Sequence, residues 1–193
     1  MGESFAERIG RVTNAFMESK VVLLGVSLGL FDRLARGPAT AAQLAADLEV
    51  TLRGIEILAD ALTACGYLTK SAGAYANTDD VNQYLVRGGE ASQAYIVGHR
   101  NQMFGTWAAL DETIRHGQTR EERAKPTLTD PETNKNFILG MAEVSRGRLG
   151  PILDRLPLDG ARLLVDVGGG PAQYACEAVR RHEGLEAVVV DLE

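Results

Sequence analysis

The residues best suited to chemistry lie together in one glycine-rich segment. Asp166 stands two residues before three consecutive glycines, Gly168, Gly169 and Gly170, and Asp191 follows at the end of the next predicted strand. Glycines directly after a strand let the backbone turn tightly and let a ligand lie against bare main chain. The free N–H groups of a helix that begins there would face that ligand. A carboxylate at the end of the next strand could accept hydrogen bonds from two ribose hydroxyls. The segment therefore predicts a nucleoside site.

Two positions indicate which nucleoside would bind. The dinucleotide pattern G-x-G-x-x-G, begun at Gly168, requires glycine where this sequence has Gln173. An acidic residue two positions before the first glycine, as Asp166 is, suits a cofactor with an ammonium group, such as S-adenosylmethionine (SAM). The alternative is a glycine-rich turn without a ligand, which the second carboxylate, Asp191, makes the poorer interpretation.

The elements around this segment predict a strand–helix–strand unit. Residues 162–167 and 185–190 are short apolar runs, typical of strands covered on both faces, and residues 172–182 have a helical pattern between them. A right-handed crossover makes the two strands parallel neighbours. Two strands cannot bury the faces of a parallel sheet, so we expect a complete domain to need more strands than this sequence holds.

The residues before this unit predict a mainly helical part with a small hairpin. Two short capped helices and strands at 67–69 and 74–76 give the layout of a winged helix. Further helices are expected at 91–115 and 132–156, and Pro151 should kink the second of these or begin a new helix. A long first helix is predicted, and its apolar stripe could pack on a partner subunit or on the core of its own domain; the stripe comprises Phe5, Ile9, Val12, Phe16, Leu23, Val26 and Leu30.

Composition and charge limit the classes of function. The 193 residues are 45% hydrophobic and 24% charged, which is typical of a soluble globular protein. The net charge of −6 does not favour nucleic acid or anionic lipid as a partner. No apolar run has the length of a membrane span, so we expect a cytoplasmic protein. Cys65 and Cys176 lack the spacing of metal ligands, and we expect two small buried side chains and no metal site.

The winged-helix layout also raises DNA binding as a hypothesis. Residues 35–90 hold four basic and seven acidic side chains, which is the wrong sign for contacts with phosphates. A DNA-binding regulator is therefore the least favoured alternative.

The chain resembles the O-methyltransferase family that includes the plant caffeic acid and flavonoid enzymes, acetylserotonin O-methyltransferase and many bacterial natural-product enzymes. The resemblance extends from about Val12 to Asp191 and corresponds to the first half or so of a typical member. The segments that carry it are Gly29-Leu-Phe-Asp-Arg-Leu, Gly37-Pro-Ala-Thr-Ala-Ala-Gln-Leu-Ala, Arg53-Gly-Ile-Glu-Ile-Leu, Asn77-Thr, Trp107-Ala-Ala-Leu, Phe137 to Ser145, and Leu164-Val-Asp-Val-Gly-Gly-Gly.

This resemblance implies a fold and a division into parts. It implies a mainly α, winged-helix-like dimerisation domain over 1–115. A linker and connecting helix follow over 116–160. Residues 161–193 would then be the first strand–helix–strand unit of an incomplete α/β Rossmann-like domain that binds SAM.

The resemblance also implies roles for single residues. Gly168 corresponds to the glycine whose main chain contacts the cofactor, within the loop that also holds Gly169 and Gly170. Asp166 begins the family motif, and Asp191 corresponds to the carboxylate that binds ribose. Ser145 matches the family's serine at the methionine end of the cofactor. Phe137 and Met141 match residues that line the pocket near the acceptor.

The implied activity is methyl transfer from SAM to a hydroxyl group of a small, aromatic, natural-product-type molecule, by a homodimer joined through the N-terminal helices. The family's general base is a histidine in the later half of the catalytic domain. His99, His116 and His182 do not match it, so we expect no catalytic residue in this chain and no activity from it alone. Two alternatives remain: half of a split enzyme completed by a second chain, and a relative that does not transfer methyl groups.

One position departs from the family motif. Ala172 stands where the family has glycine. We expect its methyl group to weaken cofactor binding without abolishing it, on the assumption that this glycine serves helix packing and does not need a positive φ.

Overall fold

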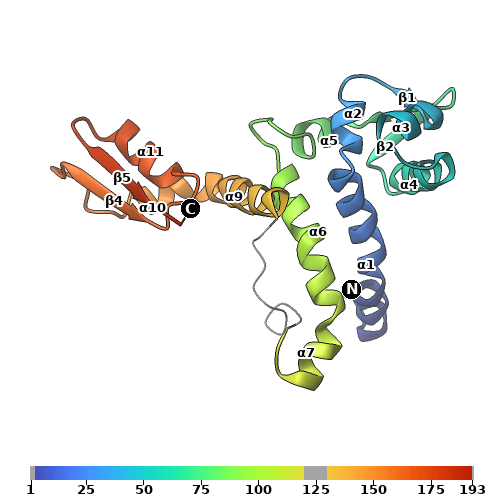
Figure 1. Ribbon diagram of the computed structural model, residues 1–193, viewed down its shortest axis with the longest axis horizontal. Helices are drawn as coiled ribbons and strands as arrows, with labels where there is room; N and C mark the ends of the chain where they lie inside the picture. The colour runs from blue at the N-terminus through green and yellow to red at the C-terminus, as the bar shows by residue number, and fades with distance from the viewer. Residues whose placement is uncertain (1–2, 120–129, 193) are drawn as a thin grey trace. The chain divides into compact units, whose positions relative to one another are not determined.

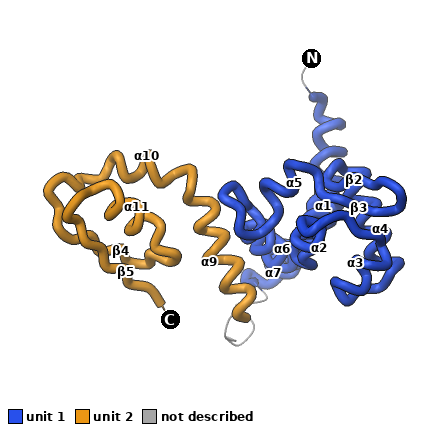
Figure 2. Tube along the Cα trace, turned by 90° about the horizontal axis from the view of Figure 1, so that it is seen from above, with its two compact units in different colours: residues 1–128 blue, residues 129–193 orange. Residues whose placement is uncertain are grey.

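A computed structural model describes residues 3–119 and 130–192 and divides the chain into two compact units. Unit 1 is Met1–Leu128 and unit 2 is Thr129–Glu193 (Figure 2). The predicted connecting helix belongs to the second unit together with the strand–helix–strand segment. Pro126, in the predicted linker, lies outside the described residues.

The first helix, α1 (Phe5–Ser27), begins at a capping box and ends before a glycine. The Ser4 hydroxyl accepts a hydrogen bond from the Glu7 N–H, and the Glu7 carboxylate accepts one from the Ser4 N–H. Gly29 has a φ of 72° and separates α1 from α2 (Leu30–Leu34). A residue in the left-handed region ends an α-helix, so the prediction of one helix through Leu30 is wrong at its C-terminal end.

The apolar stripe of the first helix divides into a buried part and an exposed part. Leu23, Val26 and Leu30 are buried in the core of unit 1. Towards the N-terminus the apolar side chains are exposed instead, namely Phe5, Ile9, Val12, Phe16 and Met17. The prediction that the stripe packs on the core of its own domain is therefore correct for the C-terminal part of α1. Only the N-terminal part of this helix offers an apolar face to a partner.

The two predicted short helices follow, each begun by a threonine. Thr40 caps α3 (Ala41–Asp47), and its hydroxyl accepts a hydrogen bond from the Gln43 N–H in a second capping box. Thr51 caps α4 (Leu52–Ala64) by accepting from the Gly54 N–H. These hydroxyls satisfy donors that the first helical turn leaves without partners.

The predicted hairpin is present and gains a short third strand. The strands β2 (Leu68–Ser71) and β3 (Ala74–Asn77) pair antiparallel, with Leu68 opposite Asn77. The strand β1 (Ala39–Thr40) pairs with the other edge of β3, which gives the order β1-β3-β2. The winged-helix layout predicted from the sequence is thereby confirmed.

The core of unit 1 joins these elements. Phe31, Leu44, Leu62 and Tyr75 are almost completely buried. Further members from α1, α2, α4 and α6 are Leu23, Val26, Leu30, Leu34, Ile55, Leu58, Ala59 and Val97. Burial on this scale stabilises by roughly 1.5–3 kcal/mol for each large apolar side chain before conformational entropy is counted.

The described part of unit 1 holds three further helices, α5 (Asp79–Tyr84), α6 (Ala94–Ala108) and α7 (Leu110–His116). The helix predicted over 91–115 is therefore two helices, separated at Ala109. Gly117, with a φ of 70°, ends α7 as predicted. The helix α6 packs along α1 (Figure 1).

Unit 2 opens with a broken helical segment. The helix α9 (Pro131–Ser145) is capped by the Asp130 carboxylate, which accepts from the Thr133 N–H. The 3-10 turn η1 (Arg146–Arg148) then leads into α10 (Leu149–Leu153). The helical segment predicted over 132–156 thus breaks, and a new helix begins just before Pro151, which confirms the predicted break at this proline.

The strand–helix–strand prediction is confirmed. The strands β4 (Leu163–Val167) and β5 (Glu186–Val190) pair in parallel, from Leu163 opposite Glu186 to Val167 opposite Val190. The helix α11 (Gln173–Arg181) connects them and covers one face of this sheet. Its core comprises Leu153, Leu158, Ala178 and Leu185.

The other face of the sheet is apolar and exposed. It carries Val165, Val167, Val188 and Val190, all with large exposed fractions. The sequence predicts that both faces of this sheet are covered, but the residues that the structure describes cover only one of them.

The two cysteines do not have the predicted environment. Cys65 and Cys176 are free and exposed. On α11 the buried positions are Ala175 and Ala178, three residues apart, and Cys176 lies off that stripe. Cys65 follows the last buried residue of α4 as its C-cap.

Candidate cofactor site

A cavity of about 310 Å³ lies in unit 2, where β4 and β5 end and α11 begins. It brings together all eight residues that the sequence analysis singled out, from α9, β4, the glycine loop and the end of the chain just after β5. Its lining comprises Phe137, Ile138, Met141, Ser145, Asp166, Gly168, Gly169, Gly170, Pro171, Gln173, Tyr174 and Asp191. Ligands of open parallel sheets bind at this position, outside the carboxyl ends of the strands.

The glycine loop is shaped by two positive φ angles and one close contact. Gly168 has a φ of 72° and Gly170 a φ of 48°. At Gly169 a Cβ atom would lie 2.7 Å from Val189 Cγ1 and 2.8 Å from the carboxyl carbon of Asp166. Real Cβ atoms do not approach other atoms so closely, so Gly169 cannot be replaced without moving the Asp166 side chain or β5.

The carboxylate of Asp166 has an unsatisfied oxygen. Its Oδ2 is buried and has no hydrogen-bond partner within the described residues. Burying a carboxylate oxygen without a donor is costly, and such a group in a cavity indicates a missing partner. An ammonium group would provide a charge-assisted donor there.

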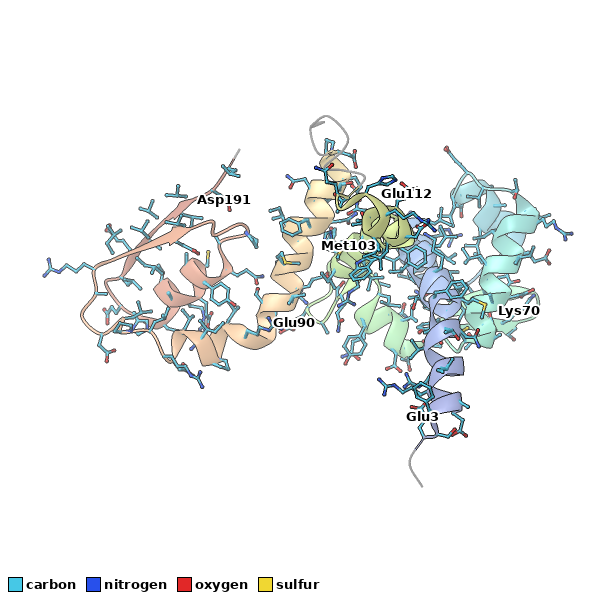
Figure 3. All side chains as sticks on the ribbon, turned by 90° about the horizontal axis from the view of Figure 1, so that it is seen from below. Glu3, Lys70, Glu90, Met103, Glu112 and Asp191 are labelled. Carbon is cyan, nitrogen blue, oxygen red and sulfur yellow. The ribbon has the colours of Figure 1, made fainter. Side chains whose placement is uncertain are left out.

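The second carboxylate, Asp191, lies just beyond the end of β5 (Figure 3). Its Oδ2 accepts the N–H of Gly170 at 2.5 Å and its Oδ1 accepts the N–H of Leu192 at 2.7 Å. The Asp191 side chain therefore ties the glycine loop to the end of the neighbouring strand. It is exposed, so each oxygen still has a lone pair for the hydroxyls of a ribose.

The helix α9 forms one wall of the cavity. Phe137, Met141 and Ser145 are four residues apart and therefore lie on one face of this helix. The Ser145 hydroxyl donates a hydrogen bond to the side-chain oxygen of Gln173, the first residue of α11. The wall is thus apolar at Phe137 and Met141 and polar at Ser145, where α9 contacts α11.

The arrangement suits a cofactor with a nucleoside and an amino-acid part. A turn without Cβ atoms at Gly168 and Gly169 admits a flat group against main chain. The carboxylate Asp191 is placed for hydroxyls, and the unsatisfied oxygen of Asp166 is placed for a cation. The geometry therefore holds both carboxylates that the SAM hypothesis needs, one for the ribose and one for the ammonium group.

The structure also identifies lining residues that the sequence analysis missed. Ile138, Pro171, Gln173 and Tyr174 line the same cavity. Gln173 entered the sequence analysis only as a departure from the dinucleotide pattern. Its place as the first helical residue after the loop was the signal that could have identified it, because side chains there lie beside the ligand.

Ala172 has a conformation that the sequence analysis did not expect. It precedes α11 with φ 58° and ψ 20°, in the left-handed region. The assumption that glycine at this position would serve only helix packing is therefore wrong, because the backbone here favours glycine by about 1–2 kcal/mol.

Two further searches of the described residues gave no site. They hold no group of three or more metal-binding side chains placed to share an ion. None of their helices combines the length and the apolar character needed to cross a bilayer.

Comparison with known proteins shows which family the chain resembles. A family model described as the O-methyltransferase dimerisation domain matches residues 11–87. Acetylserotonin O-methyltransferase of Macaca mulatta is 28% identical over 207 residues, which cover 99% of this chain and 60% of the relative. The crystal structure of human N-acetylserotonin methyltransferase in complex with SAM matches with a TM-score of 0.78 and 26% identity, covering 98% of this chain and 60% of that one.

The chain is similar over nearly its whole length to members of the class I O-methyltransferase family. Its match includes the N-terminal dimerisation part and the start of the catalytic domain. A bacterial relative, the 3-hydroxy-5-methyl-1-naphthoate 3-O-methyltransferase of Streptomyces sahachiroi, is 30% identical over 184 residues, which cover 91% of this chain and 52% of the relative. The chain therefore spans about 60% or less of the length of these O-methyltransferases. The resemblance and the mainly helical fold inferred from the sequence are both confirmed.

Proposed function

We propose that the complete protein transfers the methyl group of SAM to a hydroxyl group of a small aromatic molecule of natural-product type. This chain supplies the glycine-loop side of the cofactor site. The observation that supports the proposal is that Asp166, Asp191, Ser145 and the glycine loop line one cavity in a chain whose relatives are SAM-dependent O-methyltransferases.

Each lining residue has a role in this proposal. Asp191 accepts hydrogen bonds from the ribose hydroxyls, and the main chain of Gly168 lies against the nucleoside. Asp166 binds the ammonium group, and Ser145 lies at the amino-acid end of the cofactor. Bound SAM supplies an electrophilic methyl group. These contacts hold the cofactor in one orientation. Orienting the methyl donor towards the acceptor is a main contribution of a protein to methyl transfer by direct displacement.

The acceptor side of the site is formed by the apolar wall. Phe137 and Met141 present a face on which an aromatic molecule can stack, and their side chains exclude water from it. The proton of the acceptor hydroxyl goes to a general base outside this lining, since the family resemblance places that base in the later half of the catalytic domain.

We also propose that the protein is a homodimer joined through its N-terminal helices. The family model that matches residues 11–87 is a dimerisation domain. Phe5, Ile9, Val12 and Phe16 form an exposed apolar stripe on α1, and such a stripe is more stable when a second subunit covers it.

The cofactor proposal is tested by calorimetric titration of SAM into the protein purified from its own source with everything that copurifies. We expect saturable binding, and a loss of at least tenfold in affinity for Gly169→Ala, whose Cβ would displace the Asp166 carboxylate. The matched control is Gly147→Ala. Like Gly169, Gly147 has no positive φ, but it has open space around it and does not line the cavity.

Absence of SAM binding by the natural protein would contradict the proposal, as would equal affinities of wild type and Gly169→Ala. The intact mass of the purified material separates the remaining hypotheses. A second chain bound to this one would support a split enzyme. Cofactor binding without methyl transfer to any phenol would support a relative with a different reaction. Salt-dependent binding to duplex DNA would support the regulator hypothesis.

A further inference from the structure

The side chain of Gln173 connects two walls of the cofactor cavity. Gln173 is the first residue of α11, and its side-chain oxygen accepts the hydrogen bond from the Ser145 hydroxyl of α9. Both side chains are half-buried and line the cavity. None of the sequence motifs assigns a role to Gln173.

The contact with Ser145 determines which end of the amide faces the ligand. A glutamine amide has one acceptor end and one end with two N–H donors. The Ser145 hydroxyl has two acceptors within reach, the side-chain oxygen of Gln173 and the Ala142 carbonyl oxygen at 3.0 Å. With its oxygen held by Ser145, the amide keeps its two N–H donors for other partners.

The charge of the described lining favours such a donor. Its charged residues are Asp166 and Asp191, and the described lining includes no lysine, arginine or histidine. Two carboxylates attract the cationic groups of SAM but repel the carboxylate of its amino-acid part. Within this lining, the N-terminal end of α11 and the amide of Gln173 can provide neutral donors to that carboxylate.

We propose that Gln173 donates a hydrogen bond to the carboxylate of the amino-acid part of the cofactor, and that Ser145 positions its amide for this contact. The inference rests on the proposed binding of SAM. Gln173 is a binding residue in it, and Ser145 acts on the carboxylate through Gln173.

The test compares two ligands that differ only in the carboxylate, SAM and decarboxylated SAM, by calorimetric titration into the natural protein and its variants. Gln173→Ala is expected to weaken SAM binding about tenfold and to leave the affinity for decarboxylated SAM unchanged. Gln173→Glu adds a third negative charge, so it should weaken SAM further and strengthen decarboxylated SAM. Ser145→Ala should weaken SAM, and its effect should largely disappear in the Gln173→Ala background.

The control is Gln83→Ala, which removes an exposed glutamine side chain from α5 in unit 1. It should leave both affinities unchanged. Equal weakening of both ligands by Gln173→Ala would overturn the inference, since the amide would then act on the fold or on the ammonium group. The opposite shifts expected for Gln173→Glu keep the test decisive if the alanine variant is poorly folded. Failure of the wild-type protein to bind either ligand would refute the SAM proposal itself, whereas binding with no effect of Gln173 would refute only this inference.

Discussion

At the scale of single residues, Ala172 shows how one side chain can conflict with the backbone around it. It is one of three non-glycine residues with a positive φ in the described part of the chain, with Glu49 and Ala72. A Cβ atom in the left-handed region crowds the following carbonyl oxygen. The loop nevertheless keeps this conformation, because Gly170 and α11 fix the chain on both sides.

Replacing Ala172 with glycine should therefore stabilise the protein. We expect Ala172→Gly to raise the free energy of unfolding by roughly 1 kcal/mol, since relief of the strain exceeds the added flexibility of the unfolded chain. Urea-induced unfolding followed by circular dichroism measures this value. Ala178→Gly, in the middle of α11 with helical φ, is the matched control and should destabilise by about 1 kcal/mol or more.

A destabilised Ala172→Gly variant would show that the left-handed conformation is not the one adopted in solution. The same variant tests the effect of the methyl group on the ligand. We expect it to bind SAM more tightly than wild type, and equal affinities would show that the methyl group does not approach the cofactor.

At the scale of elements, five of the helices that the structure describes begin at side chains that satisfy their first N–H groups. Ser4, Thr40, Thr51, Thr78 and Asp130 all accept such hydrogen bonds, and two of them form complete capping boxes. The short helix α3 depends on this most, because seven residues form few internal hydrogen bonds.

We therefore expect Thr40→Ala to lower the free energy of unfolding by about 1 kcal/mol. Thermal unfolding by calorimetry detects this change. Thr69→Ala provides the comparison: this exposed threonine of β2 makes only a long hydrogen bond of 3.5 Å, and its removal should change stability by less than about 0.5 kcal/mol. Equal losses in the two variants would show that the cap does not stabilise α3.

The end of α11 contains an ion-paired carboxylate that should respond to pH. Hydrogen bonds from Arg180 and then Arg181 hold the pKa of Glu177 at about 2, below its usual value of 4.5. A carboxyl group whose pKa is lower in the folded state stabilises above pH 4.5 and loses this effect as the pH falls towards 2.

Glu177→Gln should accordingly lower the melting temperature at pH 7, and the difference from wild type should vanish as the pH is lowered from 4.5 to 2. The group faces solvent, so the difference should also shrink at high salt. Glu183, an exposed neighbour, makes no ion pair with the described residues, so Glu183→Gln should melt like wild type at every pH. A difference for Glu177→Gln that persists unchanged at pH 2 would rule out its ionisation as the cause.

At the scale of the whole molecule, the exposed stripe on α1 is the feature that calls for a second subunit. Phe5 is 76% exposed, and Ile9, Val12 and Phe16 are each about half exposed or more. The same helix buries its C-terminal half in the core of unit 1. A helix with one half anchored in this way can present the other half rigidly to a partner.

A charge placed in this stripe should dissociate the proposed dimer. Phe16→Asp removes about 2 kcal/mol of apolar burial per subunit, so we expect the dissociation constant to rise by roughly 100-fold or more. Sedimentation velocity over a range of concentrations measures the change. Asn14→Asp introduces the same charge on the opposite side of α1 and should leave the dimer intact. A wild-type protein that stays monomeric at every concentration would contradict the proposal.

The sequence by itself determined those features that depend on neighbours along the chain. The glycine loop with Asp166 and Asp191, the parallel strand–helix–strand unit and the capped helices of the winged helix follow from local spacing and from residue types with restricted conformations. The positions of helix breaks were less well determined. Gly29 ends α1 through a left-handed φ that its neighbours do not specify, and Ala109 separates α6 from α7 inside a continuous apolar pattern.

Only the tertiary structure decided which surfaces meet. It showed that the apolar stripe of α1 is buried at one end and exposed at the other, since burial depends on whether α4 and α6 reach that part of the helix. It also brought Ser145 and Gln173, 28 residues apart, into one hydrogen bond across the cavity. It revealed that Ala172 is held at a positive φ. Contacts between residues distant in sequence set these features, and local preference carries no information about such contacts.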